Sequence, residues 1–142
     1  MKKTRNGRQE AIRDLVRREK IRTQGELVEK LQERGFPCTQ ATVSRDIAEM
    51  NLRKLSEGVY VLAEDLHLQR MVADLVLDVV RSDNLVLVKA SSGSAAAVAA
   101  ALDAADLPEV LGSIAGDDTI LVIGNDVESA ERFEAAINKL RL

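Results

Sequence analysis

The sequence has few of the residues that hold metal ions or cross-link a chain. Its 142 residues include one cysteine, Cys38, and one histidine, His67. A zinc site built from cysteine and histidine within one chain is therefore excluded, because such a site takes several of these ligands. A disulfide framework needs paired cysteines and is excluded as well, which is the pattern expected of a protein in a reducing cytoplasm.

Long apolar segments are also missing. Met1 is followed by lysine and polar residues instead of an apolar stretch, so no signal peptide is predicted. No apolar run approaches the roughly 18 residues that a membrane-spanning helix needs. We therefore expect a soluble protein of the cytoplasm, with a cytoplasmic localisation and no membrane partner.

Charge is unevenly divided along the chain, whose net charge is −3. Residues 1–63 contain 14 Lys/Arg and 9 Asp/Glu, for a net charge of +5, whereas residues 64–142 contain 6 and 14, for −8. A basic half is typical of nucleic-acid binding, although it can also be an ordinary solvated surface. Only three residues are aromatic, and single-strand binders stack bases on aromatic side chains, so double-stranded DNA is the favoured target. The change of sign predicts two small domains, at 1–63 and 71–142, joined by a linker at 64–70.

Three helices are predicted in the basic half. Apolar residues at helical spacing predict helices over residues 8–18, from residue 24 onward and over 40–51. Thr23 and Thr39 are the expected N-caps of the second and third helices, because their hydroxyls can accept from otherwise unpaired amides. A short turn joins these two helices, which is the pattern of a helix-turn-helix.

Two short apolar segments follow the third predicted helix. Residues 52–55 and 59–62 are separated by Ser56, Glu57 and Gly58, which predicts a β-hairpin. A hairpin in this position is a wing, so the basic half is predicted to be a winged helix-turn-helix domain that binds DNA.

The outward face of the third predicted helix is the expected DNA-contacting surface. At about 100° per residue, Val43 and Ile47 fall on one side and Arg45 falls roughly opposite. Arginine and glutamine can bind guanine and adenine through paired hydrogen bonds, whereas basic side chains of the wing reach phosphates. The residues expected at DNA are Gln40, Thr42, Ser44, Arg45, Arg53 and Lys54, with Lys2, Lys3 and Arg5 of the amino-terminal arm at phosphates.

The acidic half alternates predicted strands and helices. Strands are expected at 75–80, 85–89, 110–115 and 119–123, and helices at 68–73, 94–105 and 127–140. This order predicts an α+β sandwich with a four-stranded antiparallel sheet and two main helices on one face. The segment 94–105 is rich in alanine. Its small side chains either pack closely on the sheet or leave space for a ligand or a neighbouring subunit.

Two adjacent carboxylates, Asp117 and Asp118, occupy the turn between the last two predicted strands. Aspartate is common in turns, so a purely structural role is one alternative. Neighbouring carboxylates repel unless a cation or strong donors compensate, so the other alternative is a receptor for a cationic group or a metal. A metal-dependent enzyme would need more ligands than this pair, and no nucleophile and base are paired in the sequence. We therefore expect neither an enzyme nor a metal cofactor.

Two separated motifs closely resemble the bacterial arginine repressor family. They are Gln40-Ala-Thr-Val-Ser-Arg-Asp46 in the third predicted helix and Gly112-Ser-Ile-Ala-Gly-Asp-Asp-Thr-Ile120 at the acidic turn. The resemblance implies a winged helix-turn-helix followed by a domain that forms trimers, two of which stack into a hexamer. It also implies L-arginine bound between subunits as the corepressor of arginine-biosynthesis operators, with activation of arginine catabolism in some members.

The resemblance also implies roles for individual residues. Carried over by position, the residues that line the L-arginine site are Asp117, Asp118, Ala115, Ser113 and Asp103, and Ser44 and Arg45 form the DNA-contacting pair. The chain departs from the family pattern in two places, since Ala95, Ala96 and Ala97 stand where a glutamine is frequent and Ser113 stands where threonine is common. The alternatives are a ligand-independent oligomeric DNA-binding protein and a metal-dependent enzyme that uses the aspartate pair.

Overall fold

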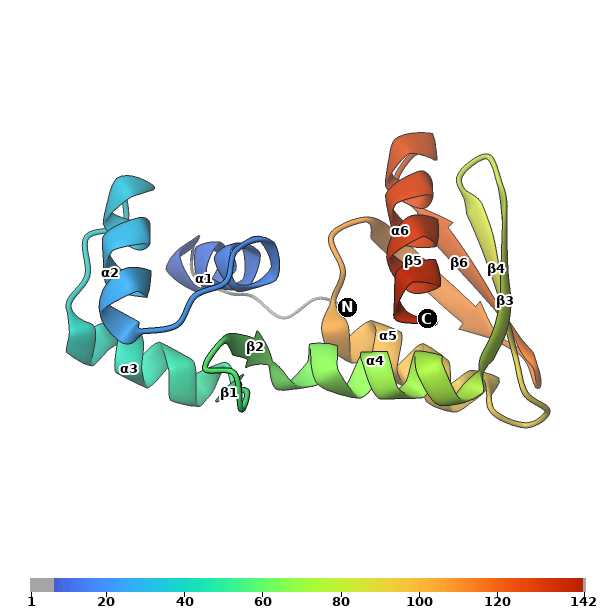
Figure 1. Ribbon diagram of the computed structural model, residues 1–142. Helices are drawn as coiled ribbons and strands as arrows, with labels where there is room; N and C mark the ends of the chain where they lie inside the picture. Colours follow the sequence, from blue (N-terminus) through green and yellow to red (C-terminus); the bar gives the residue numbers. More distant parts are fainter. Residues whose placement is uncertain (1–6, 142) are drawn as a thin grey trace. The chain divides into compact units, whose positions relative to one another are not determined.

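The chain divides into two units, residues 1–63 and 64–142, and the computed structural model describes residues 7–141. The first unit contains α1 (Gly7–Arg18), α2 (Gln24–Glu33), α3 (Gln40–Glu49), β1 (Leu52–Lys54) and β2 (Tyr60–Leu62), as Figure 1 shows. Strands β1 and β2 are antiparallel, with Arg53 opposite Val61. Buried apolar side chains from all three helices and both strands form one core. The predicted winged helix-turn-helix is confirmed.

Hydroxyl caps define where two of these helices begin. The backbone N–H of Glu26 donates to Thr23 Oγ1 at 3.0 Å, and that of Thr42 donates to Thr39 Oγ1 at 3.3 Å. Glu26 reaches back to the N–H of Arg22 at 2.8 Å, one residue before the N-cap. The α3 helix ends at Glu49, earlier than predicted, because Asn51 adopts a left-handed φ of 56° that a helix cannot continue through.

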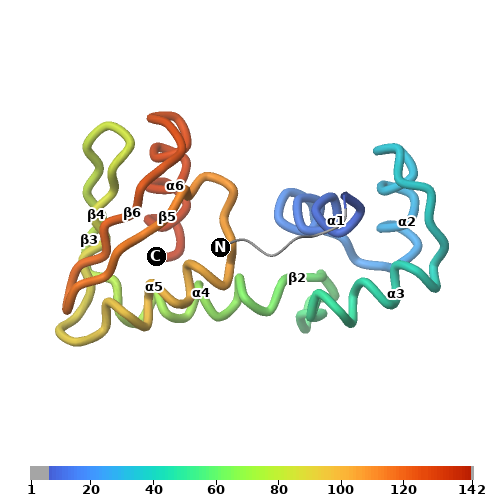
Figure 2. Tube along the Cα trace, turned by 180° about the vertical axis from the view of Figure 1, so that it is seen from behind, coloured from blue at the N-terminus to red at the C-terminus, as the bar shows by residue number. Residues whose placement is uncertain are grey.

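The second unit is an antiparallel sheet with helices on one face. Its elements are α4 (Ala63–Leu75), β3 (Val76–Ser82), β4 (Leu85–Ala90), α5 (Ala95–Ala105), β5 (Val110–Ala115), β6 (Thr119–Gly124) and α6 (Val127–Leu140). The strand order is β3-β4-β6-β5, and every neighbouring pair is antiparallel. Helices α5 and α6 lie on the same side of the sheet (Figures 1 and 2), as predicted. The core lies between these layers and includes Val86, Val98, Ile120 and Phe133.

The helix that leads into β3 begins earlier than predicted. The predicted linker at 64–70 and the predicted helix at 68–73 both lie within the continuous helix α4. Leu68 and Val72 are four residues apart and both are buried in the second core, which favours a helix through this segment. On α6, Ala136 is exposed because it lies about 100° around the helix from the buried Ile137.

The face of the sheet opposite α5 and α6 carries apolar side chains. Val80 lies opposite Leu87, Leu87 opposite Leu121, and Leu121 opposite Ile114, so one apolar row crosses all four strands. We call this row the open sheet face. Ile114 is 68% exposed, because in this unit the helices cover only the other side. Among residues 7–141, no helix has the length and apolar character that crossing a membrane requires.

Candidate functional site

The turn between β5 and β6 presents both aspartates at the surface. It is closed by the N–H of Gly116, which donates to the carbonyl of Thr119 at 2.8 Å. Asp117 turns its carboxylate toward the start of α5, where Oδ2 accepts from the N–H of Gly93 at 3.2 Å and from Ser92 Oγ at 3.4 Å. Its carbonyl accepts from the N–H of Ala95 at 3.0 Å. Asp117 therefore ties the turn to the first residues of α5.

These contacts take the place of a side-chain N-cap on α5. Ser94 is at the N-cap position, but its hydroxyl donates to the carbonyl of Ser91 at 2.6 Å and makes no capping bond to the helix. The carbonyl of Asp117 accepts from the first amide of the helix, that of Ala95, and its carboxylate accepts from the N–H of Gly93 just before the N-cap. A negative charge in this position is favourable, because the N-terminus of a helix carries a partial positive charge.

Asp118 has a different environment. Its Oδ1 accepts from the hydroxyl of Thr119 at 2.9 Å, and its carbonyl accepts from the N–H of Ala90 at 2.7 Å. Lys89 donates to the same Thr119 hydroxyl at 2.9 Å, a basic neighbour that sequence reasoning missed. The β4–β6 register, in which Lys89 and Thr119 are opposite, brings the lysine to this turn. The side chain of Asp118 is exposed, so one of its oxygens can receive an incoming donor.

Of the other residues expected at the ligand, two lie close to this turn in the fold and one lies far from it. Ser113 and Ala115 lie on β5, the strand that leads into it, opposite Val122 and Ile120. Asp103 is exposed on α5, eight residues after Ala95, and so about 12 Å along the helix from the end that contacts Asp117. The structure therefore does not bring Asp103 beside the aspartate pair within one subunit.

The alanine-rich helix α5 packs closely on the sheet along one side and is exposed along the other. Ala95, Ala99, Ala101 and Ala105 are buried against the sheet, which is close packing of small side chains. Ala96 and Ala97 are exposed near the aspartate turn. These two methyl groups leave the surface beside the turn shallow at positions where the resemblance implies a glutamine.

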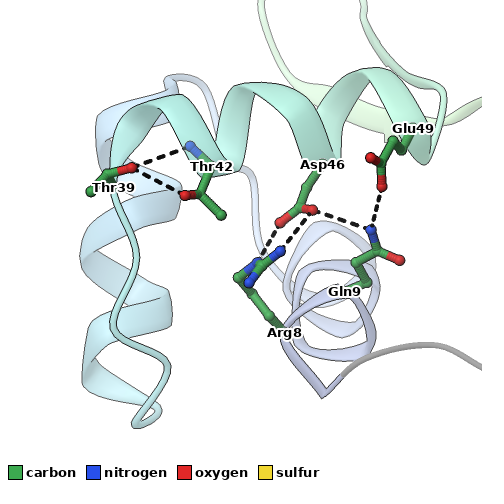
Figure 3. Close-up of polar contacts among 6 residues, drawn as sticks. All are labelled: Arg8, Gln9, Thr39, Thr42, Asp46 and Glu49. Carbon is green, nitrogen blue, oxygen red and sulfur yellow. Dashed lines mark hydrogen bonds and ion pairs between the residues drawn. The ribbon is translucent and has the colours of Figure 1, made fainter.

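The predicted DNA-contacting residues lie on α3 and β1. Gln40, Ser44, Arg45, Arg53 and Lys54 are all exposed. Thr42 is half-buried, and its hydroxyl lies 3.1 Å from that of Thr39 within the helix cap (Figure 3), so it is less available to DNA than predicted. The Nζ atom of Lys54 lies 5.2 Å from the centre of the Tyr60 ring. The predicted arm residues Lys2, Lys3 and Arg5 lie outside the described residues.

The wing is held to the loop that precedes α2. Arg22 donates from Nη1 to the carbonyl of Glu57 at 2.8 Å, and the N–H of Tyr60 donates to the carbonyl of Ile21 at 2.9 Å. Gly58, at the tip, has a φ of 89°, which only glycine adopts without strain. These contacts fix where the exposed side chains of β1 stand.

A buried carboxylate on α3 was missed by sequence reasoning. Asp46 is 2% exposed and accepts from Arg8 Nε at 2.5 Å and Nη2 at 3.1 Å, and from Gln9 Nε2 at 3.1 Å (Figure 3). Burial by itself raises the pKa of Asp46, but the hydrogen bonds from Arg8 and Gln9 and the arginine charge outweigh it and hold that pKa below its ordinary value. Its position three residues after Val43, on the apolar side of α3, is a signal in the sequence that indicates a partner.

Family models of known proteins match both halves of the chain. Residues 2–68 match the model described as arginine repressor, DNA binding domain. Residues 72–139 match the model described as arginine repressor, C-terminal domain. The two matches follow each other in the same order as the two units of the fold.

Individual relatives align with nearly the whole chain. The arginine repressor of Thermus thermophilus is 46% identical, and the alignment covers 89% of this chain and 84% of the relative. The arginine repressor of Solibacter usitatus is 44% identical, and the alignment covers 92% of this chain and 92% of the relative. That of Carboxydothermus hydrogenoformans is 43% identical, with 93% of this chain and 95% of the relative covered. The chain therefore belongs to the arginine repressor family, a family of DNA-binding transcriptional repressors.

Proposed function

We propose that this protein is an arginine-responsive transcriptional regulator that binds operator DNA and uses L-arginine as the corepressor of arginine-biosynthesis genes. The observation that carries the proposal is the exposed aspartate turn in a chain whose other unit is a basic winged helix-turn-helix. On DNA, Ser44 and Arg45 read base edges from α3 while Arg53 and Lys54 of the wing contact phosphates.

The aspartate turn is suited to a guanidinium group. A guanidinium is planar and presents several donors in a fixed arrangement, which a carboxylate accepts through two hydrogen bonds. Asp118 is exposed and its Oδ1 is already oriented by Thr119. We assign Asp118 to the cationic group of the ligand, with Asp117 shaping the turn and Ser113 and Ala115 lining its approach along β5.

The open sheet face supports an oligomer. An apolar row that crosses four strands is the kind of surface that a second copy of the chain covers, because leaving it in water is unfavourable. In a trimer, and in a hexamer of two trimers, an arginine bound between subunits would meet Asp103 of a neighbouring copy. This accounts for the distance of Asp103 from the aspartate turn within one chain.

Ligand binding and DNA affinity are linked through assembly. A ligand that binds the assembled form better than separate trimers stabilises that form. A hexamer holds several winged domains together, so once one is bound the others reach neighbouring half-sites at high effective concentration. Arginine thereby increases operator affinity without contacting DNA.

Calorimetry with L-arginine and L-lysine tests this proposal. We expect L-arginine to bind and to tighten the complex with a duplex that the protein selects from a random library, and we expect L-lysine to do neither to a comparable extent, because an ammonium lacks the planar fork. Equal effects from the two amino acids would contradict the proposed recognition. DNA binding without any arginine effect would favour the ligand-independent alternative.

A further inference from the structure

A buried polar contact in the DNA-binding unit joins α1 to α3. Arg8 approaches Asp46 with two nitrogens, Nε at 2.5 Å from Oδ2 and Nη2 at 3.1 Å from Oδ1. The Asp46 side chain is 3% exposed and that of Arg8 is 28% exposed. A paired, forked hydrogen bond of this kind fixes direction as well as distance, because both partners are planar.

A second side chain extends this contact along α3. Gln9 donates from Nε2 to Asp46 Oδ1 at 3.1 Å and to Glu49 Oε2 at 3.0 Å (Figure 3). Residues 46 and 49 are nearly one helical turn apart. With contacts at both places, α3 is constrained in its rotation about its own axis and in its position along that axis.

Apolar packing alone constrains α3 less. Val43 is the buried apolar residue of this helix, whereas Ile47 and Met50 are half-buried. Apolar contacts are not directional and tolerate small rotations better than a planar ion pair does. The Arg8–Asp46 pair therefore supplies the directional part of the helix packing.

The rotation of α3 decides where its outer side chains stand. Arg45 precedes Asp46 directly and is exposed, as is Ser44. At a radius of about 6 Å, a rotation of about 20° moves the end of a side chain by about 2 Å. A shift of that size breaks hydrogen bonds to base edges, whose geometry is narrow.

We propose that Arg8 and Asp46 are positioning residues for operator recognition, which hold α3 at the rotation in which Ser44 and Arg45 read the bases. This inference rests on the proposed DNA-binding function. The pair acts through α3 and not through contact with DNA, since Asp46 is buried. Its loss therefore affects discrimination between sequences more than attraction to phosphates, which depends on exposed cations.

The test compares variants of the full chain on two duplexes. The first duplex is selected from a random library by the wild-type protein with L-arginine present, and the second is its scrambled version. Specificity is measured as the Kd for the scrambled duplex divided by the Kd for the selected duplex. We expect Asp46→Asn and Arg8→Gln each to reduce this Kd ratio about tenfold, with the Kd for the scrambled duplex within about twofold of wild type. The double variant is expected to lose no more than the worse single variant, because both remove one shared interaction.

A second ion pair on α1 provides matched controls. Arg18 Nε lies 2.7 Å from Asp14 Oδ1, and these side chains are 74% and 39% exposed. Asp14→Asn and Arg18→Gln make the same charge changes as the two test variants without touching α3. Asp14 also accepts from Arg34 Nη1 at 2.8 Å, at the end of α2, so Arg18→Gln is the stricter control. We expect both controls to keep the Kd ratio within about twofold of wild type, since surface pairs contribute little to the position of a helix.

Arg8→Lys covers the case in which Asp46→Asn fails to fold. It keeps the positive charge but removes the paired hydrogen bonds of the guanidinium. We expect a Kd ratio about threefold lower than wild type at an unchanged melting temperature. Variants that lose thermal stability but keep the wild-type ratio would overturn the positioning role, as would a ratio that falls equally in the controls. A wild-type chain that selects no duplex would instead overturn the proposed function, and the positioning role with it.

Discussion

The hydroxyl of Thr119 donates a hydrogen bond to Oδ1 of Asp118 at 2.9 Å while it accepts one from Nζ of Lys89. The carboxylate that we assign to the ligand is therefore oriented before any ligand arrives. Pre-orientation lowers the entropy that binding must overcome. Asp117, whose carboxylate contacts Gly93 and Ser92, is oriented toward its own chain instead.

This difference predicts separate effects for the two aspartates. Asp118→Ala is expected to abolish the rise in melting temperature that L-arginine produces, with little change in the ligand-free protein, because its side chain contacts only a neighbouring hydroxyl in the described structure. Asp117→Ala is expected to lower the ligand-free stability by about 1 kcal/mol, because the N–H of Gly93 and the hydroxyl of Ser92, just before α5, lose their acceptor. Thermal unfolding with and without arginine measures both. A normal arginine response in Asp118→Ala would show that the pocket lies elsewhere.

Base reading and phosphate contact are expected to separate between α3 and the wing. Arg45→Ala is expected to cost about 1–3 kcal/mol of discrimination between the selected and scrambled duplexes, without changing arginine binding. Lys54→Ala serves as the control, because a lost phosphate contact weakens both duplexes alike and reduces the salt slope by about 1. Titrations at several salt concentrations distinguish the two patterns. If Arg45→Ala weakens binding to both duplexes alike, as Lys54→Ala does, the assignment of base reading to Arg45 is wrong.

The open sheet face is expected to be covered in the assembled protein. Leu87 is 40% exposed and lies in the middle of the apolar row, so Leu87→Lys places a charge where a second copy would pack. We expect this variant to have a smaller molar mass by light scattering, with and without arginine, because burying an unpaired charge is costly. Val127, 44% exposed on α6, is the control position, and Val127→Lys is expected to keep the wild-type mass. An unchanged mass for Leu87→Lys would mean that another surface forms the oligomer.

Acid is expected to destabilise the first unit through Asp46. Burial raises the pKa of Asp46, but Arg8 and Gln9 lower it by more, so the folded pKa lies below the ordinary value of 3.8. A lowered folded pKa contributes stability that is fully present above 3.8 and is lost as the pH falls through the folded pKa. The pKa of Asp14 is lowered in the same way, because hydrogen bonds from Arg34 and Arg18 outweigh its burial.

Denaturant titrations between about pH 7 and pH 2.5 measure this effect. We expect the contribution of Asp46 to be constant down to about pH 4 and to decline below it. Asp46→Asn is expected to be less stable at neutral pH and to lose less stability in acid, because the asparagine does not titrate. An acid decline of the same size in both proteins would exclude Asp46 as a source.

Elements with a clear pattern follow closely from the sequence. The strand at 110–115 and the helix at 127–140 have the predicted bounds, because a turn and an N-cap mark where they begin or end. The start of α4 was not predicted from the sequence. Glu64 and Asp65 lie in its first turn, where acidic side chains favour a helix N-terminus, but this signal is weak by itself. Its helical form depends on Leu68 and Val72, which are buried only once the second core has formed.

The sequence by itself determined the division into a basic and an acidic half, the order of helices and strands, and the two motifs that mark the family. All three are local, since they depend on charge, periodicity and spacing along the chain. Only the tertiary structure decided that Asp117 is engaged by the start of α5, that Asp118 faces solvent, and that Asp46 is buried against Arg8. These contacts join residues 24 and 38 positions apart, and a hydrogen bond across such a separation forms only after the core has brought the elements together.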